Sequence, residues 1–534
     1  MKGIAVAPQP PAVEAAVTTL RNGGNAIDAA VTAAFVQMIV DPQMCGVAGF
    51  GVANVRAADG RQLVIDFNGT AGSKARPDMW VDIVKEMDWT GYGYHLEGQV
   101  NDVGYQAIMT PGTVAGLAET LRRFGTISWA DALQPAIRVA EEGFLIPMDL
   151  WRGWNVPGAA IGRLSMKERL QATPGSKQLY IKQNGETYRP GERFRNPDYA
   201  KTLHRLAEAG PEDFYRGELA QRMAEDFERN GAFITAADLA GYQPTVSEPL
   251  EISYRGYSVF TNPPAGGGVC LAETLKILEH EDIAALGLNS LEYIELVGMA
   301  MKAAYHDWYG CVGDSRFVDV PVERLLGDRH TSQWYKRIKA GERFSVPRYP
   351  EGPDTTNITV VDGAGNCVAI THSLGASGGV VTPGLGFTYN NIMNAANPQP
   401  GKPNSIAPGK SRITGICPTI VLKDGEPVLT LGAPGGTRII TGVLQATLNI
   451  LDHGLSPVEA VSAPRFDCQS DILDCESRIP SWVRDELGRR GFQINPNPSA
   501  YGNFAVVGAV TRDPVTGSLA GGADPRRGGA VMEA

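Results

Sequence analysis

The feature that most constrains this chain is the stretch 354–362, where a strand pattern begins at a pair of threonines. Residues 356–361 are β-branched or apolar apart from Asn357, a turn rich in glycine follows at 362–366, and a second strand pattern runs through 367–374. The pattern predicts a β-hairpin. A threonine at its leading end has a hydroxyl nucleophile, and cutting the preceding bond would free its α-amine as a base. The alternative is an ordinary edge strand whose threonines only pack and form hydrogen bonds.

The composition favours a large folded chain without nucleic-acid or membrane partners. The 534 residues are 43% hydrophobic, enough for a sizeable core in one large fold or several domains. The formal net charge is −10 with scattered acids, which disfavours nucleic acid and leaves no basic membrane patch. No apolar run in the sequence has the length of a membrane span.

The cysteines and histidines give no sequence signal for a metal site. The seven cysteines are dispersed without a CxxC pair, and the seven histidines form neither an HExxH motif nor an evident cluster with acids. We therefore expect no metal, no disulfide framework and a reducing compartment. The first residues lack a charged-then-apolar signal pattern, so the expected location is the cytoplasm.

The order of predicted elements favours two sheets covered by helices. Residues 12–40 predict two helices, the second capped by Asn25 and apolar nearly all round, hence buried. Further helices are predicted at 113–124, 129–142, 196–230, 269–279, 291–309 and 438–451. Strands are predicted at 250–253, 257–261, 356–362, 367–374, 386–390, 417–423, 427–431, 492–496, 504–511 and 517–519. Two sheets with helices outside both suit this order.

Several short motifs, taken together and in order, resemble the γ-glutamyltransferase (γ-glutamyltranspeptidase) family of N-terminal-nucleophile hydrolases. Each motif is modest alone, but the similarity extends over nearly the whole chain. The segments that carry it are 22–30, 111–116, 254–257, 317–321, 355–356, 418–420, 432–438 and 463–466.

The resemblance implies a four-layer αββα fold made as one self-cleaving precursor. The bond cut would be Asp354–Thr355, giving a large subunit 1–354 and a small subunit 355–534 that remain intertwined as one fold, which could pair as a homodimer. By resemblance, Thr355 is the nucleophile and its freed amine the base. Ser373 occupies the position of a supporting hydroxyl, and Gly435 and Gly436 match the oxyanion-hole glycines; taken alone, these glycines would indicate only a strand-to-helix turn.

The implied chemistry is cleavage of a small-molecule amide through an acyl-threonine, with water or an amine as acceptor. Glycine amides at a helix N-terminus suit a developing oxyanion. No metal or organic cofactor is needed. The family's activity on glutathione-type γ-glutamyl compounds is one expected outcome.

The predicted acyl pocket departs from the family pattern at both charged anchors. Asn68 stands where the family has a carboxylate-gripping arginine, and Asn394 and Ala395 stand where it has an acid that holds the α-amine. Thr414 and Gly415 stand where the family has a pair of serines that bind the carboxylate, and Gly375 stands where it has a pocket asparagine. Losing a bidentate arginine is not a neutral exchange.

Three interpretations follow. The favoured one is an amidohydrolase or acyltransferase of this family. A second is a member with other specificity, resembling oxamate amidohydrolases or glutaryl and cephalosporin acylases, and a third is an inactive scaffold. Lys74, Arg76 and Arg412 are candidates for a replacement charge, with an exposed surface position as the alternative for each. His372 either lines the pocket or packs in the core.

Overall fold

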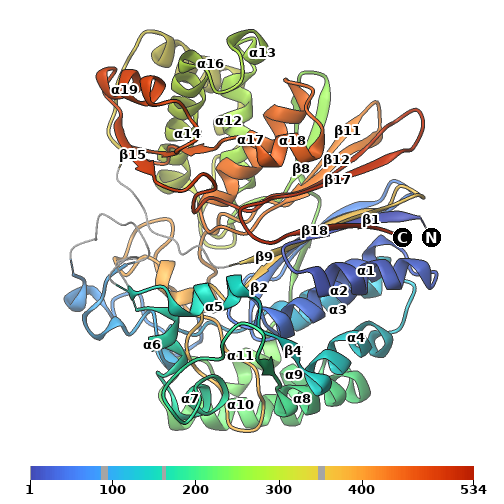
Figure 1. The fold of residues 1–534 in the computed structure, drawn as a ribbon. Helices are drawn as coiled ribbons and strands as arrows, with labels where there is room; N and C mark the ends of the chain where they lie inside the picture. Colours follow the sequence, from blue (N-terminus) through green and yellow to red (C-terminus); the bar gives the residue numbers. More distant parts are fainter. Residues whose placement is uncertain (1, 86–93, 159–163, 347–354) are drawn as a thin grey trace.

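The computed structural model stacks two β-sheets face to face, with helices on both outer faces (Figure 1). It describes residues 2–85, 94–158, 164–346 and 355–534. The predicted four-layer αββα fold is therefore confirmed, and the mixture of helix and strand follows the expected order along the chain.

The first sheet places the predicted hairpin in its interior. Its seven described strands are, in spatial order, β18 (Ala530–Glu533), β1 (Gly3–Ala7), β9 (Thr356–Asp362), β10 (Cys367–Ser373), β2 (Phe50–Arg56), β3 (Gln62–Asp66) and β6 (Thr245–Ser247). All neighbours pair antiparallel. Because β9 lies between β1 and β10, the alternative of an edge strand is wrong.

The second sheet is antiparallel and has six described strands. In spatial order they are β17 (Leu519–Ala523), β16 (Gly508–Arg512), β12 (Glu426–Gly432), β11 (Thr419–Lys423), β8 (Tyr257–Thr261) and β7 (Leu250–Tyr254). It meets the first sheet through an apolar layer that includes Val6, Val361 and Ile420. Asn54 of β2 also donates to the carbonyls of Phe260 and Pro418 across the interface.

Helices on the free face of the first sheet form one outer layer, and their apolar sides share a core with its strands. They are α1 (Pro10–Arg21), α2 (Ala26–Val40), α3 (Thr113–Phe124), α4 (Trp129–Glu142), α8 (Pro197–Ala209), α9 (Asp213–Arg216), α10 (Glu218–Arg229) and α11 (Ala236–Gly241).

Helices on the second sheet form the other outer layer. They are α12 (Gly268–Leu278), α13 (Ile283–Leu286), α14 (Leu291–Cys311), α15 (Val322–Leu326), α16 (Asp328–Lys339), α17 (Arg438–Leu451), α18 (Pro457–Ser462) and α19 (Ser481–Arg489). Smaller elements lie at the periphery: α5 (Met148–Asn155), α6 (Met166–Leu170), α7 (Pro174–Tyr180), β4 (Phe144–Leu145), β5 (Arg193–Phe194), β13 (Phe466–Asp467), β14 (Ile472–Glu476) and β15 (Gln493–Asn497).

Helix α2 shows how the sequence fixes the layer behind the hairpin. Asn25 caps it as predicted: its side chain accepts from the backbone N–H of Ile27 and Asp28, and Asp28 accepts in return from the N–H of Asn25. All of its residues are buried, as expected for a helix that is apolar on every side. The helix therefore supports the first sheet directly below β9 and β10.

One strand prediction is wrong, and some strands were missed. No strand forms at 386–390, where the chain makes only a single bridge between Tyr389 and Ala48. The strands β1 and β18 were not predicted, although they complete the first sheet.

In the part of the chain that is described, no helix is long and apolar enough to cross a membrane.

Candidate active site

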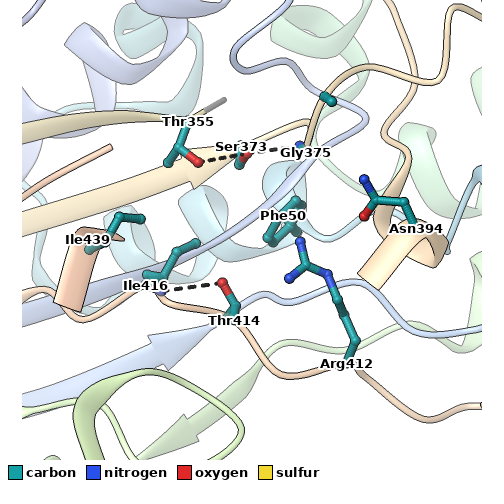
Figure 2. A pocket seen from close by; sticks show the side chains of 10 residues that line it. Phe50, Thr355, Ser373, Gly375, Asn394, Arg412, Thr414, Ile416 and Ile439 are labelled. Atoms are coloured by element: carbon teal, nitrogen blue, oxygen red, sulfur yellow. Dashed lines mark hydrogen bonds between the residues drawn. The ribbon is translucent and has the colours of Figure 1, made fainter. Parts of the chain in front are cut away.

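A small pocket lies where the start of β9 meets the loops that follow β10 and precede β11 (Figure 2). Its cavity volume is about 10 Å³, roughly the space of one water molecule. The lining residues are Phe50, Thr355, Ser373, Gly375, Ala376, Asn394, Arg412, Thr414, Ile416 and Ile439. Five of the predicted site residues are thus brought together: Thr355, Ser373, Gly375, Asn394 and Thr414.

Thr355 and Ser373 form the polar centre of this pocket. The Thr355 hydroxyl donates to Oγ of Ser373 at 3.1 Å, and the backbone N–H of Gly375 donates to the same oxygen at 2.8 Å. Thr355 is only 4% exposed. A hydroxyl held by a second, oriented hydroxyl in a nearly dry pocket is suited to nucleophilic attack. The other half of the predicted cleavage site, Asp354, lies outside the described residues.

His372 lies on the opposite face of β10 and does not line the pocket. It is fully buried, and its Nε2 lies 2.9 Å from Oε1 of Gln37 on α2. The Gln37 amide nitrogen donates to Gln9 and to the carbonyl of Asn357, so its oxygen faces the ring and Nε2 carries the proton. Burial lowers the pKa of His372 to about 3. Of the two alternatives for this residue, core packing is correct.

The turn at Gly435 and Gly436 lies at the N-terminal end of α17. Both glycines have positive φ, at 140° and 61°. Ile439, in the first turn of α17, lines the pocket of Thr355, which brings this helix end to the pocket. Gly435 itself lines a larger neighbouring cavity of about 590 Å³. Ala376 lines both cavities, so the glycine turn stands beside the boundary between them.

Two other glycines are required by close approaches. A side chain at Gly375 would meet the amide oxygen of Asn391, which accepts from the backbone N–H of Ala376. A side chain at Gly415 would meet the carbonyl of Gly436. Gly415 does not line the pocket, but its lack of a side chain lets the glycine turn pack against it.

Three residues were predicted at the positions of the family's two charged anchors, and only one of them lines the pocket. Asn68 lies outside it, and its amide nitrogen donates to the backbone carbonyl of Arg412 at 2.9 Å. Ala395 also lies outside, with its carbonyl accepting from Asn404. Asn394 lines the pocket, so a neutral amide stands where an acid was expected.

The nearest acid to Asn394 that the described contacts show is Asp102. The Asn394 amide lies 3.5 Å from Oδ1 of Asp102, while Arg169 forms a buried ion pair with the same carboxylate at 2.5 Å. Asn391 also donates to Asp102. Asp102 is therefore neutralised behind the pocket and does not line it.

Among the three candidates for a replacement charge, only Arg412 is in the pocket. It is 2% exposed, its guanidinium lies 5.2 Å from the centre of the Phe50 ring, and Nη1 donates to the carbonyl of Ile413 at 2.8 Å. Lys74 and Arg76 are exposed, as their alternative interpretation predicted. The lining residues Phe50, Ala376, Ile416 and Ile439 carried no sequence signal.

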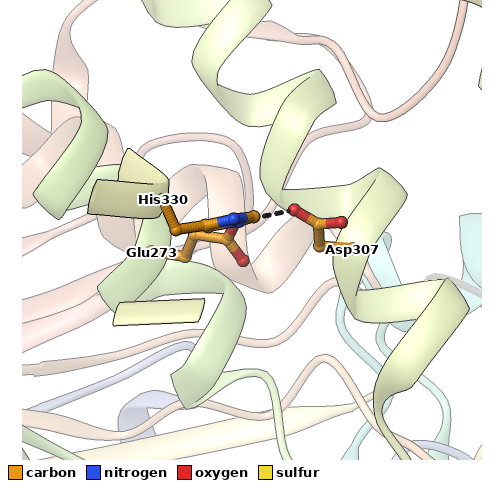
Figure 3. A group of neighbouring side chains, drawn as sticks. All are labelled: Glu273, Asp307 and His330. Carbon is orange, nitrogen blue, oxygen red and sulfur yellow. Dashed lines mark hydrogen bonds and ion pairs between the residues drawn. The ribbon is translucent and has the colours of Figure 1, made fainter. Parts of the chain in front are cut away.

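A separate cluster joins three helices of the outer layer (Figure 3). Nε2 of His330 on α16 lies 3.1 Å from Oε1 of Glu273 on α12 and 2.9 Å from Oδ2 of Asp307 on α14. Burial, together with the neighbouring Asp307, raises the pKa of Glu273 well above its ordinary value. No sequence motif marks this cluster, because its three residues lie on separate helices far apart along the chain. All seven cysteines are free, and Cys417 is buried.

Known proteins are similar to this chain over most of its length. The family model described as gamma-glutamyltranspeptidase matches residues 12–534. An acylase ACY 1 proenzyme of Pseudomonas sp. (strain V22) is 36% identical, over 98% of this chain and 92% of its own. The glutathione hydrolase proenzyme of Escherichia coli (strain K12) is 32% identical, over 89% and 80%.

A solved structure agrees with the sequence comparisons. The crystal structure of cephalosporin acylase from Bacillus halodurans superimposes with a TM-score of 0.88 at 30% identity, covering 99% of this chain and 95% of that one. Because the family model matches nearly the whole length of this chain, the chain belongs to the gamma-glutamyltranspeptidase family.

Proposed function

We propose that this protein is a self-processing amidohydrolase or acyltransferase that uses Thr355 as an N-terminal nucleophile. The observation that carries the proposal is the contact between the Thr355 and Ser373 hydroxyls inside a small pocket at the start of β9. Cleavage before Thr355 would give subunits 1–354 and 355–534. The proenzyme names of similar proteins support two subunits made from one precursor.

The mechanism follows from the groups around the pocket. Cleavage frees the α-amine of Thr355, which takes the hydroxyl proton as Oγ1 attacks the substrate carbonyl. Backbone amides of the Gly435–Gly436 turn, beside the positive end of α17, stabilise the oxyanion. The C–N bond then breaks and the amine leaves with a proton. Water or a second amine attacks the acyl-threonine, giving an acid or a new amide.

We also propose that the acyl group is not γ-glutamyl. An α-ammonium group would meet the neutral amide of Asn394, and no acid lines the pocket among the described residues. The acylase relative and the superimposed cephalosporin acylase support this choice within the family. Activity on glutathione is the second candidate, favoured by the glutathione hydrolase relative.

The first test is self-cleavage. The purified chain should separate in denaturant into two fragments, the smaller beginning at Thr355 and weighing about 19 kDa in proportion to its share of the 57.0 kDa chain. Thr355→Ala should remain uncut and inactive, whereas Thr355→Ser retains a hydroxyl and should still be cut. N-terminal sequencing and intact mass measure this. Normal cleavage and turnover by Thr355→Ala would exclude Thr355 as the nucleophile, and a wild-type chain that stays intact would favour an inactive relative.

The second test is acyl specificity. Each charge-assisted hydrogen bond missing from an amino-acid head group is worth about 1.5–3 kcal/mol, so γ-glutamyl turnover should fall about 10²- to 10⁴-fold below that of a fitting acyl group. We expect kcat/KM for glutaryl p-nitroanilide to exceed that for γ-glutamyl p-nitroanilide. A strong preference for the γ-glutamyl compound would contradict the proposed specificity and support the second candidate.

A further inference from the structure

The cluster of Glu273, Asp307 and His330 brings together side chains from α12, α14 and α16 (Figure 3). One nitrogen or oxygen atom from each residue lies within 4.8 Å of the other two. Figure 3 shows the edge of the imidazole and both carboxylates turned toward one another. None of the three residues lines the pocket of Thr355, so the cluster is separate from the proposed active site.

The cluster holds more hydrogen-bond acceptors than donors. Nε2 of His330 lies 2.9 Å from Oδ2 of Asp307 and 3.1 Å from Oε1 of Glu273. A neutral imidazole has a single N–H, which serves only one of these two oxygens well. The second oxygen of Glu273, Oε2, is buried and has no hydrogen-bond partner among the described residues. Because a buried carboxylate oxygen without a partner is costly, this arrangement calls for a positive ligand.

The neighbouring arginines do not supply that ligand. Arg324 is close enough to act electrostatically on Glu273, but its Nη2 donates to Sγ of Cys311 at 3.5 Å. Arg337 forms its ion pair with Glu342. Among the described side chains, no arginine or lysine forms an ion pair with Glu273.

The spacing of the cluster suits a small divalent metal ion. Around a tetrahedral Zn²⁺ with bonds of about 2.0–2.1 Å, neighbouring ligand atoms lie about 3.3 Å apart. The two nitrogen–oxygen distances in the cluster are only a few tenths of an ångström shorter. Nε1 of Trp334 also donates to Oδ2 of Asp307 at 2.8 Å, which is the kind of outer hydrogen bond that orients a metal ligand.

We propose that Glu273, Asp307 and His330 bind Zn²⁺ or a similar divalent transition-metal ion that joins the three helices. One imidazole with two carboxylates favours such an ion over Mg²⁺ and Ca²⁺, which prefer oxygen ligands alone. His330 binds through the lone pair of Nε2 and carries its proton on Nδ1. Its side chain is 18% exposed, which gives the ion a route from solvent and leaves room for a water ligand.

The experiment titrates the full-length, chelator-treated protein with Zn²⁺ by calorimetry. We expect one ion per chain and a higher Tm in Zn²⁺, with no such rise in Mg²⁺ at the same concentration. The affinity for Zn²⁺ should fall more than about 100-fold in His330→Gln, which loses a ligand, and about 10- to 100-fold in Trp334→Phe, which loses the outer hydrogen bond. His204→Gln is the matched control, because it removes an exposed histidine that pairs with Glu141, and it should bind like the wild type.

Three results would overturn the proposal. A wild type that takes up no Zn²⁺ would mean that the two carboxylates share a proton instead. Unchanged affinity in His330→Gln would place the ion elsewhere, and an equal rise of Tm in Mg²⁺ would exclude a site selective for transition metals.

Should His330→Gln not fold, chemical protection of the wild type decides. Zn²⁺ should block the modification of His330 by diethyl pyrocarbonate, mapped by mass spectrometry, and leave the exposed His204 reactive. Equal modification of His330 with and without Zn²⁺ would reject the site.

Discussion

At the scale of single residues, the alternation of side chains along each strand decides which polar side chains in this region reach the pocket. Thr355 and Ser373 face the pocket, while their neighbours Thr356 and His372 face α2, because successive residues of a strand point to opposite faces. His372 is thereby kept neutral. Its pKa of about 3 lies far below the ordinary value, since a charged ring in this core has lost its hydration.

This burial predicts a pH dependence of stability. Between pH 3 and 6.5 the unfolded chain binds a proton at His372 that the folded chain does not, so the free energy of unfolding should fall as the pH falls through this range. His372→Gln should remove about 1.4 kcal/mol per pH unit from that slope. Urea unfolding at pH 4, 5, 6 and 7 compares the two proteins. Parallel curves would mean that His372 is protonated in the folded state.

The sequence was informative about several residues that meet in the pocket and less so about what surrounds them. The Thr355–Ser373 contact follows from a hairpin, whose register is local, and was predictable. Arg412 was only one of three candidate charges, because its position in the pocket depends on contacts with Asn68 and Phe50 that lie far away in the sequence. Such long-range contacts leave no local pattern.

At the scale of elements, the hairpin β9–β10 was predictable, but its central place in the sheet was not. Its outer neighbour β1 comes from the other end of the chain, and a five-residue strand gives little periodic signal. At 386–390 the reverse happened: the sequence has an apolar pattern, but no strand forms. Phe387 and Tyr389 are apolar because they pack in the core beneath the first sheet, while positive φ at Gly384 and Gly386 bends the backbone.

The turn between β12 and α17 offers a test at this scale. Gly436 has φ near +60°, a conformation that asparagine tolerates and valine does not. If its amide, or that of Gly435, holds the oxyanion, Gly436→Val should lower kcat by about 10²–10³, and Gly436→Asn by much less. Steady-state kinetics should be read beside the melting temperature and the extent of self-cleavage. A fully active, fully cut Gly436→Val enzyme would remove this turn from the mechanism.

At the scale of the whole molecule, both sheets combine strands from either side of the proposed cleavage site. In the first sheet, β9 and β10 lie between β1 and β2; in the second, β11 pairs with β8. Cutting one bond breaks none of these ladders. Each proposed subunit would therefore contribute strands to both sheets and residues to their cores. This arrangement is expected of a fold that forms as one continuous precursor and is cut afterwards.

This interlocking predicts that the cut fragments stay together in native solution and separate only on unfolding. The two should co-elute in size-exclusion chromatography. After cleavage, unfolding should become dependent on protein concentration, because refolding then requires two chains to meet, whereas uncut Thr355→Ala should show no such dependence. Urea midpoints measured over a hundredfold range of concentration provide the comparison. Free small fragment in the native column profile would contradict the prediction.

The pairing of β1 with β18 also brings the two ends of the described chain together. Ile4 lies opposite Glu533, and the N–H of Ala534 donates to the carbonyl of Gly3. A short linker between these ends would preserve the order of strands, and opening the chain at 354–355 would create a circular permutant whose sequence starts at Thr355. In such a protein, removal of the initiator methionine would free the α-amine of the proposed nucleophile without self-cleavage, and maturation and catalysis could be studied as separate events.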